Sequence, residues 1–484
     1  MSIATLNPER VWKHFYALTQ IPRPSKHEQK AVEFVAKFGK DLGLETFVDE
    51  VCNVIIRKPA TKGMENRKGI ILQGHLDMVP QKNSDKVHDF VKDPIEAYVD
   101  GEWVKAKGTT LGADNGIGVA MAMAVLEAKD LEHGPIEALF TIDEETGMTG
   151  AFGLKPGLLK GDILINLDSE EEGELCVGCA GGLDATFIFN YKEENIPAGY
   201  EAYKLSITGL KGGHSGVDIA LGRANANKLL MRLLKKASHT FEFSVASING
   251  GSLRNAIPRE AFTTIAVPSQ KVEAFKKFVA DFTAIVTKEF SATEPDLSIS
   301  VKATDTPKAV INRVEQEKII NLVLAIPNGV MRMSDSMRGL VETSTNLAIV
   351  QAENGKLLIA NLLRSSVDSA KEALGDKMEA LAALAGTEIE LAGAYPGWKP
   401  NPSSAILQAM KDTYKKLYGK EPVVNAIHAG LECGLLGGVY PDLDMISCGP
   451  TLCFPHSPDE QLNIASVDKC WKFLLETLKS APVK

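Results

Sequence analysis

The sequence lacks a hydrophobic run long enough to cross a bilayer. Its apolar stretch from Val119 to Leu126 falls well short of the about 20 residues that a membrane-spanning helix needs. The first ten residues also lack the basic and apolar regions of a secretory signal peptide. We therefore expect a cytoplasmic protein that does not insert into a membrane.

Clusters of lysine and arginine interleaved with aromatic residues are missing as well. Acidic residues outnumber basic ones, 62 to 53, and the formal net charge is −9. Nucleic acid is therefore a poor candidate partner. The cysteines number seven, and an odd number scattered along a chain without an export signal indicates thiols rather than a disulfide framework.

Two styles of secondary structure follow one another along the 484 residues. Up to about residue 186, apolar strands alternate with amphipathic helices, which is the pattern of an α/β sheet. From Ala185 onward, strands such as 203–208 alternate apolar and polar residues, which indicates a sheet with one exposed face. The segment 394–402, rich in proline and glycine, predicts a crossing back to the first style.

We therefore expect an α/β fold with a discontinuous catalytic domain, residues 1–186 and 398–484, whose central mixed sheet is flanked by helices. Residues 187–397 would form an inserted α+β domain. Near the start of the chain, Ser25 and Glu28 stand three residues apart in the pattern of a capping box, which predicts a helix over 26–42.

A supported metal ligand is indicated where the apolar strand 69–73 runs into His75 and Asp77. Alternate residues of an extended strand point to the same side, so both side chains project together from its carboxyl end. One imidazole nitrogen can bind a cation while the other donates its proton to Asp77. A histidine capping a strand beside a solvated aspartate has the same pattern, so this motif does not suffice by itself.

Four later stretches place more polar side chains at or beyond expected strand ends, where open α/β sheets carry their sites. They supply Asp114 in the glycine-rich loop 108–118, Glu144 and Glu145 after the strand 136–142, Asp168 after the strand 162–167, and the late His456. A phosphate-binding loop is the alternative for 108–118. It is disfavoured because the Gly-Lys-Ser/Thr ending is absent and Asp114 would repel a phosphate.

Together these side chains form a nitrogen and oxygen donor set suited to Zn²⁺, with Co²⁺ or Mn²⁺ also tolerated. Two histidines and three carboxylates are more than one tetrahedral ion needs. A pair of cations sharing Asp114 uses them all: His75, Asp114 and Asp168 on one cation, and Asp114, Glu145 and His456 on the other. Such ions lie about 3.5–4 Å apart.

Glu144 and Glu145 are adjacent, so their side chains diverge. One of them can bind metal while the other faces the water between the cations. A carboxylate that is not a ligand can then act as the general base of a hydrolysis. A solvated acidic loop is the alternative, but this loop follows an apolar strand and precedes tight turns.

At this point the sequence resembles the co-catalytic metallopeptidase family that includes carboxypeptidase G, aminoacylase and carnosine-cleaving dipeptidases. The motifs that carry the resemblance are His75-Leu-Asp77, Gly112-Ala-Asp-Asn-Gly116, Asp143-Glu-Glu145, Asp168-Ser169 and His456. Similarity to the aminoacyl-histidine dipeptidases of that family extends over 107–118, 166–174, 211–218 and 456–459.

The resemblance implies that Asp114 bridges two metals and that Glu144 is the base. It also implies that Asp77 orients His75. Relatives use either Glu or Asp at the position of Glu145, so the preferred metal does not follow from the sequence.

The resemblance also implies roles for three residues of the insert, which would act as a lid and dimerisation domain. His214 matches a lid histidine that binds the substrate carbonyl oxygen, and Asn255 matches a lid asparagine that assists it. Arg364 is a candidate clamp for the substrate carboxylate, although the sequence by itself also fits an ordinary surface arginine.

We therefore expect a homodimeric metallodipeptidase that cleaves unblocked dipeptides, with Xaa-His substrates such as carnosine among them. A carboxypeptidase or an N-acyl amino acid deacylase on the same two-cation site is the first alternative. A metal-stabilised binding protein without catalysis is the second.

Two further motifs are open to a metal-binding interpretation. Cys176 and Cys179 resemble half of a zinc knuckle, but no second Cys-x-x-Cys exists, so packed thiols are favoured. His428 and Glu432 stand at helical spacing and could form a ligand pair, although both cations are already furnished. The role of Glu432 stays open.

Overall fold

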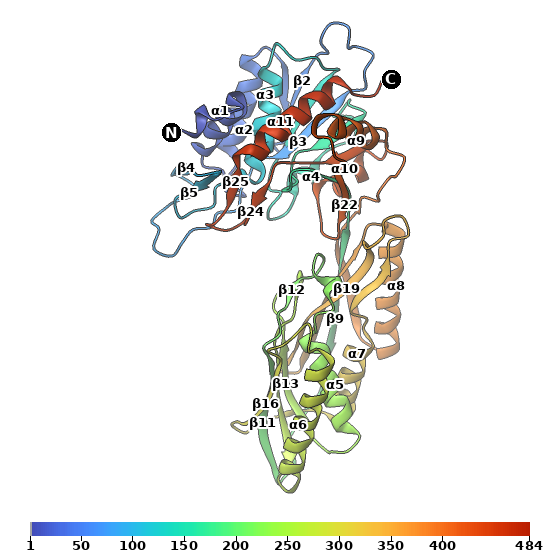
Figure 1. The fold of residues 1–484 in the computed structure, drawn as a ribbon. Helices are drawn as coiled ribbons and strands as arrows, with labels where there is room; N and C mark the ends of the chain where they lie inside the picture. The colour runs from blue at the N-terminus through green and yellow to red at the C-terminus, as the bar shows by residue number, and fades with distance from the viewer. Residues whose placement is uncertain (1) are drawn as a thin grey trace. The chain divides into compact units, whose positions relative to one another are not determined.

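The computed structural model describes residues 2–484, whose contacts divide the chain into two compact units (Figure 1). Unit 1 comprises the chain up to Gly178 together with Trp398–Ala426 and Leu431–Lys484. Unit 2 comprises Cys179–Gly397 and the short segment Ile427–Gly430. Each unit is therefore assembled from segments that are distant in sequence.

Unit 1 is built on an eight-stranded mixed sheet. In sheet order its strands are β1 (Glu45–Val48), β2 (Val54–Lys58), β6 (Ile136–Thr141), β3 (Ile70–His75), β7 (Ile163–Asn166), β23 (Asp444–Ser447), β8 (Glu174–Cys179) and β22 (Val423–Ile427). The four central strands β6, β3, β7 and β23 are parallel, whereas β1, β2 and β8 pair in the antiparallel sense. The predicted mixed sheet is confirmed.

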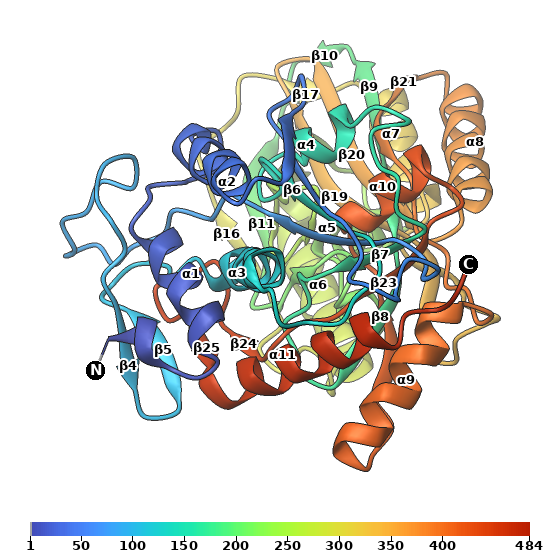
Figure 2. The same ribbon diagram turned by 90° about the horizontal axis from the view of Figure 1, so that it is seen from above.

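The central strands are nearly all apolar because both of their faces are covered. Every residue of β3, β6 and β7 is buried. Helices flank the sheet (Figure 2): α1 (Glu9–Thr19), α2 (Gln29–Asp41), α3 (Ala113–Glu127), α4 (Thr149–Gly153), α9 (Ala405–Tyr418), α10 (Glu432–Val439) and α11 (Ile464–Lys479). A smaller sheet joins β24 (Leu452–Cys453), β25 (Gln461–Asn463), β5 (Trp103–Ala106) and β4 (Ala97–Asp100) in that order.

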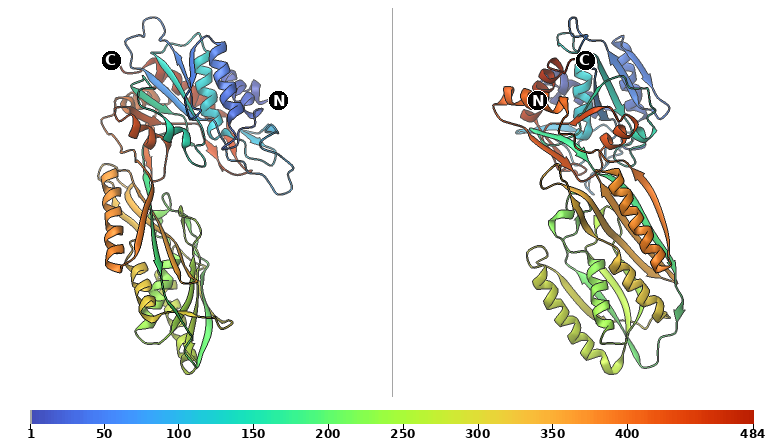
Figure 3. Two further views of the ribbon diagram at one scale, coloured as in Figure 1. Left: turned by 180° about the vertical axis from the view of Figure 1, so that it is seen from behind. Right: turned by 90° about the vertical axis from the view of Figure 1, so that its right-hand side faces the viewer.

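Unit 2 is built on a nine-stranded antiparallel sheet. In order along the sheet the strands are β16 (Ser298–Ala303), β11 (Tyr200–Thr208), β15 (Ala261–Pro268), β13 (Ser244–Gly250), β19 (Val341–Glu353), β20 (Lys356–Ser365), β9 (Gly181–Asn190) and β21 (Glu388–Tyr395), with β18 (Gly329–Met333) paired to β19. Four helices cover one face of this sheet (Figure 3): α5 (Ala226–Ser238), α6 (Val272–Glu289), α7 (Arg313–Ala325) and α8 (Asp368–Ala385). Their apolar faces form the core of the unit with the inward side chains of the strands.

Two short ribbons complete unit 2. One pairs β10 (Glu193–Glu194) with β17 (Val310–Ile311), and the other pairs β12 (Gly213–His214) with β14 (Ala256–Ile257). The second ribbon carries His214 on one strand and directly follows Asn255 on the other. The fold therefore brings two of the expected substrate-binding residues together.

None of the helices in residues 2–484 is both long enough and apolar enough to cross a membrane. The seven cysteines form no disulfide among the described residues. Cys176 and Cys179 are both buried on β8, where the Cys176 thiol donates to the carbonyl of Gly178. The burial of both side chains agrees with their interpretation as packed thiols.

Candidate active site

The carboxyl ends of neighbouring parallel strands place the candidate metal ligands along one edge of the unit 1 sheet. β3 pairs in parallel with both β6 and β7, and it ends at His75. Glu145 lies four residues beyond the end of β6, and Asp168 lies two residues beyond the end of β7. Parallel neighbours end at the same edge, so these three side chains converge.

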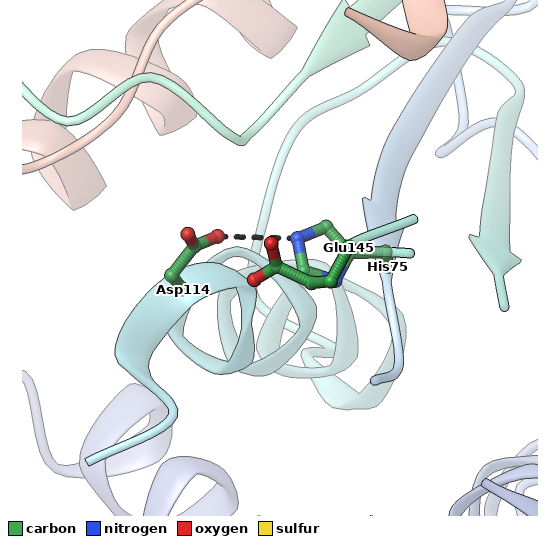
Figure 4. Close-up of side chains that lie close together, drawn as sticks. All are labelled: His75, Asp114 and Glu145. Atoms are coloured by element: carbon green, nitrogen blue, oxygen red, sulfur yellow. Dashed lines mark hydrogen bonds and ion pairs between the residues drawn. The ribbon is translucent and has the colours of Figure 1, made fainter. Parts of the chain in front are cut away.

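The carboxylate of Asp114, in the first turn of α3, is shared between two groups of donors. Figure 4 shows its contact with His75, with the side chain of Glu145 close by. On one side its Oδ1 lies 3.1 Å from His75 Nε2, which is also 3.4 Å from Asp168 Oδ1. On the other side its Oδ2 lies 3.1 Å from His456 Nε2, which is 3.0 Å from Glu145 Oε2. The structure thus brings together all five of the predicted metal ligands.

This donor set fits two cations. Ligand atoms about 2.0–2.1 Å from a tetrahedral ion lie about 3.3 Å from one another, which is close to the separations within each group. Two buried carboxylate oxygens of this donor set are poorly compensated: Oε1 of Glu145 has no hydrogen-bond partner, and Oδ1 of Asp168 has only the 3.4 Å contact with His75 Nε2. A buried oxygen of this kind is costly unless something compensates it, and a cation would do so.

Protons compete with cations for these ligands. Burial lowers the pKa of His75, but the carboxylates of Asp168, Asp114 and Asp77 outweigh that effect and raise this pKa well above its usual value. Hydrogen bonds to Asp114 and Glu145 raise the pKa of His456 to about 11. Both imidazoles must lose a proton to bind a cation, so cation binding would release protons.

Asp77 supports both the first ligand and the loop of the candidate base. The completely buried Asp77 places its Oδ1 3.2 Å from His75 Nδ1. It also accepts the backbone N–H groups of Glu144 and Glu145, at 3.0 and 3.2 Å. Burial opposes its ionisation, but hydrogen bonds from His75, Ser25 and the Glu144 N–H prevail and lower the pKa of Asp77 to about 2.

Glu144 lies in an environment that raises its affinity for a proton. Burial raises the pKa of Glu144 well above its usual value. The nearby charge of His75 lowers this pKa, whereas the nearby charges of Asp168, Glu432 and Glu145 raise it further. A carboxylate with a raised pKa can take up a proton that a weaker base would leave on water.

The predicted capping box at Ser25 and Glu28 is wrong. Helix α2 begins at Gln29, and its N-cap, Glu28, makes no side-chain capping bond. Instead, Ser25 Oγ donates to Asp77 Oδ2 at 2.8 Å. Glu28 Oε1 accepts from the backbone N–H of Asp143 at 3.1 Å. These residues support the active-site loops, and only their long-range partners reveal it.

A second group of carboxylates, Glu28, Asp77 and Asp143, has ligand atoms within 4.8 Å of one another. Asp143 accepts hydrogen bonds from Lys26 Nζ at 2.7 Å and from Thr149 Oγ1 at 2.8 Å. Because hydrogen-bond donors already compensate these oxygens, the group is a network that holds loops rather than a further metal site.

Glu460, which lies four residues beyond His456, supports the site although no sequence pattern marks it. Its buried carboxylate accepts the backbone N–H groups at the start of α3, from Leu111 to Asp114. These are the groups that a phosphate would need, so the phosphate-loop interpretation of 108–118 is wrong.

His428 and Glu432 do not form a ligand pair. Helix α10 begins only at Glu432, and the two residues fall in different units. Glu432 Oε2 accepts from Gln73 Nε2 at 2.6 Å and from Thr141 Oγ1 at 2.8 Å. It is thereby fixed to β3 and β6, near the strand ends that carry the ligands.

In unit 2, His214 is held in one tautomer. Its Nδ1 accepts the backbone N–H groups of Gly216 and Val217, at 3.2 and 3.1 Å. A neutral imidazole that accepts at Nδ1 carries its proton on Nε2. The ribbon brings Asn255 alongside, because the Asn255 carbonyl accepts from the backbone N–H of Ser215 at 2.8 Å.

Arg364, on β20, is 4% exposed, so the surface-arginine interpretation is wrong. Its guanidinium contacts Ser215 Oγ at 3.3 Å and the hydroxyl of Tyr395 at 3.2 Å. Within residues 2–484 no carboxylate lies within ion-pair distance of it. Its Nη2 lies 3.5 Å from His214 Nε2. Both nitrogen atoms carry protons, so two hydrogen-bond donors lie side by side here. The place between them calls for a hydrogen-bond acceptor.

His428 belongs to the same cluster. Its Nε2 lies 2.7 Å from Ser344 Oγ, and Ser344 is the cross-strand neighbour of Arg364. Burial, with the positive charge of Arg364, lowers the pKa of His428 to about 3. His428 is therefore neutral near pH 7.

Comparison with known proteins gives a family. Peptidase family M20/M25/M40 matches residues 71–480. The cytosol non-specific dipeptidase of Escherichia coli (strain K12) is 49% identical over 482 residues, which cover 100% of this chain and 99% of that protein.

Solved structures agree with this result. The aminoacylhistidine dipeptidase of Vibrio alginolyticus superposes with a TM-score of 0.94 at 48% identity, over 100% of this chain and 99% of that one. The aminopeptidase PepT of Bacillus cereus shares the fold, with a TM-score of 0.57 at 17% identity over 98% of this chain and 99% of that one. The chain belongs to peptidase family M20/M25/M40.

Proposed function

We propose that the protein is a dipeptidase that hydrolyses the peptide bond of unblocked dipeptides with two divalent cations per chain. The observation that carries this proposal is the shared carboxylate of Asp114, whose two oxygens lie 3.1 Å from His75 Nε2 and 3.1 Å from His456 Nε2. It is supported by the two relatives, 49% and 48% identical, that are named as dipeptidases.

The residues divide into two ligand sets that meet at Asp114. His75, Asp114 and Asp168 would hold one cation, and Asp114, Glu145 and His456 the other. Zn²⁺ suits these nitrogen and oxygen donors, and Co²⁺ or Mn²⁺ can replace it. When bound, the cations lower the pKa of water and polarise the peptide carbonyl.

Glu144 acts as the general base. It takes a proton from the attacking water and passes it to the nitrogen of the leaving amino acid. Asp77 places the base through the hydrogen bond from the Glu144 N–H, and it fixes the tautomer of His75 through Nδ1.

Three residues of unit 2 bind the substrate. His214, with its proton on Nε2, and Asn255 donate hydrogen bonds to the carbonyl oxygen as negative charge develops there. Arg364 binds the carboxylate at the end of the dipeptide, because a buried guanidinium needs an anionic partner. Xaa-His dipeptides such as carnosine fall within this substrate class, and the name of the Vibrio alginolyticus relative supports their inclusion.

The test compares three substrates on metal-depleted enzyme reconstituted with Zn²⁺, Co²⁺ or Mn²⁺. A dipeptide, its N-acetylated form and its C-terminal amide are assayed in parallel. We expect chelation to abolish activity, each metal to restore it, and the unmodified dipeptide to be preferred over both blocked forms. Preference for the N-acetylated form would establish the carboxypeptidase or deacylase alternative, and full activity without metal would overturn the proposal.

The same assay tests the role of Arg364 by comparing the dipeptide with its C-terminal amide. Arg364→Gln should raise KM for the dipeptide while leaving KM for the C-terminal amide almost unchanged, because the amide offers no carboxylate. Arg232→Gln is the matched control, since Arg232 forms a half-exposed ion pair with Glu289 in the same unit. Equal effects on the dipeptide and the amide would contradict the clamp.

We further propose a cytoplasmic homodimer in which residues 187–397 act as the lid and dimerisation domain. The unit 2 sheet ends in β16 and β21, each of which leaves one edge unpaired. Such edges call for cover, and a twofold contact between copies supplies it at both subunits. Light scattering should give twice the mass of one chain, whereas a monomer at micromolar concentration would exclude this assembly.

A further inference from the structure

The loop between β24 and β25 carries His456, and Glu460 closes that loop. β24 and β25 pair at its base, through Cys453 opposite Gln461. His456 has a φ of 58°, in the left-handed region that is uncommon for residues other than glycine. Its side chain is 51% exposed, so packing does little to fix it. Besides its contacts with Asp114 and Glu145, the position of His456 depends on how the backbone of the loop is held.

Glu460 connects this loop to the segment that contains Asp114, whose carboxylate is shared by the two ligand sets. Glu460 is 2% exposed. One carboxylate oxygen accepts the N–H groups of Leu111 and Gly112 at 2.7 and 3.0 Å, and the other accepts those of Ala113 and Asp114 at 2.7 and 3.3 Å. One side chain thus holds four successive backbone N–H groups in place.

A buried arginine ties the same segment to the first ligand. Arg23 donates to the carbonyls of Leu76 and Asp77, at 2.9 and 2.8 Å, and also to the carbonyl of Gly112. The loops that carry Asp77, Asp114 and His456 are therefore joined through two buried charged groups.

We propose that Glu460 is a positioning residue that fixes His456 relative to Asp114 and thereby sets the affinity of the second cation. This inference rests on the ligand sets proposed above. The cation between Asp114, Glu145 and His456 depends on it, because His456 has no other ligand of its set on the same loop. The cation between His75, Asp114 and Asp168 depends on it less, because His75 ends β3 and Asp168 lies two residues beyond β7, which pairs with β3 in parallel.

The geometry requires a carboxylate of this length. Glutamine at position 460 would turn an NH₂ group toward two backbone N–H donors, which leaves those donors without an acceptor. Aspartate keeps both oxygens but is one methylene shorter, so the loop would have to move to preserve the bonds. Glu460→Gln and Glu460→Asp therefore perturb the same contact in different ways.

The test is titration of metal-depleted protein with Zn²⁺ by calorimetry, with Co²⁺ absorption as a second readout. We expect Glu460→Gln to weaken the second cation by about 10–100-fold, the range typical when a residue that supports a ligand is lost, and to leave the first within about threefold. Glu460→Asp should weaken the second cation in the same direction but less. Zn²⁺ affinities unchanged in Glu460→Gln would overturn the proposal.

A matched control separates positioning from general stability. Glu137 is also buried and accepts two backbone N–H groups, those of Lys160 and Gly161, both at 2.7 Å. It lies near the amino end of β6, away from the ligands. Glu137→Gln should lower the melting temperature yet bind two cations with the affinities of the wild type. If it weakens the second cation as much as Glu460→Gln does, the effect is general and the proposal is wrong.

A double-mutant cycle assigns the effect to His456. In a His456→Ala background the second cation is already lost, so Glu460→Gln should change the remaining affinity by less than about threefold. In a His75→Ala background it should still weaken the cation that remains. If neither Glu460 variant folds, the residue is a structural requirement and the proposal is overturned.

Failure of this inference can be told apart from failure of the proposed function. A wild-type protein that binds no cations would refute the two-cation dipeptidase. A wild type that binds two cations and cleaves dipeptides, with Glu460→Gln unchanged, would refute only the role of Glu460.

Discussion

At the scale of single residues, the two adjacent glutamates have different surroundings although they share a turn. Asp77 accepts the N–H groups of both, which fixes the backbone of that turn. Glu145 then contacts His456 at 3.0 Å, whereas Glu144 has the environment of a carboxylate with a raised pKa. One turn can therefore supply a ligand and a base.

Substitution of each glutamate separates these roles. Glu144→Gln should retain two cations per chain and lose about 10²–10⁴-fold in kcat, because only the proton acceptor is removed. Glu145→Gln should lose cation occupancy together with activity, because it removes a ligand. Metal content by mass spectrometry and kcat are measured on the same preparations, and the reverse pattern would show that the two roles are exchanged.

His428 gives a pH dependence of stability whose sign can be worked out. Its folded pKa of about 3 lies below the about 6.5 of an unperturbed histidine. The unfolded chain therefore binds a proton first as the pH falls, so this contribution to stability is complete above pH about 6.5 and is lost toward pH 3. Each pH unit in that window costs up to about 1.4 kcal/mol.

We expect His428→Gln to flatten the decline of the unfolding free energy between pH 6.5 and 4, measured by urea denaturation of the metal-depleted protein. The exposed His239 serves as the control, and His239→Gln should keep the slope of the wild type. Parallel curves for His428→Gln and the wild type would contradict this account.

At the scale of elements, the start of α2 shows how an active-site demand can displace a local rule. The spacing of Ser25 and Glu28 fits a capping box, yet Ser25 Oγ donates to Asp77 and Glu28 accepts from Asp143. The N-terminal segment therefore supports loops that follow β3 and β6 rather than its own helix.

The consequence can be measured with Ser25→Ala. This variant should weaken Zn²⁺ binding by up to about 10-fold, because Asp77, which orients the ligand His75, loses a hydrogen-bond donor. Ser404→Ala is the control, since Ser404 Oγ truly caps α9 by accepting from the N–H of Leu407 at 3.0 Å. The control should cost about 1 kcal/mol of stability and leave Zn²⁺ affinity unchanged. Loss of stability alone in Ser25→Ala would restore the capping interpretation.

At the scale of the whole molecule, the two kinds of chemistry belong to different units. The candidate metal ligands and Glu144 lie in unit 1, and the donors His214 and Arg364 lie in unit 2. We predict that His214 serves the metal site of the other subunit of a dimer. This prediction depends on the proposed assembly and concerns which chain supplies the residue.

Mixing two inactive variants tests it. His214→Ala and Glu144→Gln chains are dissociated, combined and reassembled. If His214 acts in trans, a mixed dimer holds one site with both wild-type residues and should regain up to half of the wild-type activity. If mixed dimers form without activity, His214 serves its own chain. Each variant reassembled alone is the control and should stay inactive.

Local patterns in the sequence were enough to predict the alternating strands and helices of the first domain and the chemical type of its metal ligands. Buried parallel strands are nearly all apolar, so the strand that ends in His75 and the one that precedes Asp168 are visible in a single sequence. Ligand identity is likewise local, because it depends on side-chain type at a strand end. The assignment of roles to the substrate-binding residues came from family resemblance, and the domain boundaries and site roles stay predictions.

Only the tertiary structure decided which polar groups meet across long separations in the chain. Leu111 and Glu460 are 349 positions apart, and nothing periodic links them. The burial of Arg364 and the supporting bonds of Ser25 and Glu28 also depend on partners from other elements. Hydrophobic periodicity reports which face of an element is buried, whereas a hydrogen bond between distant loops depends on where the packed elements place their ends, which is a property of the assembled fold.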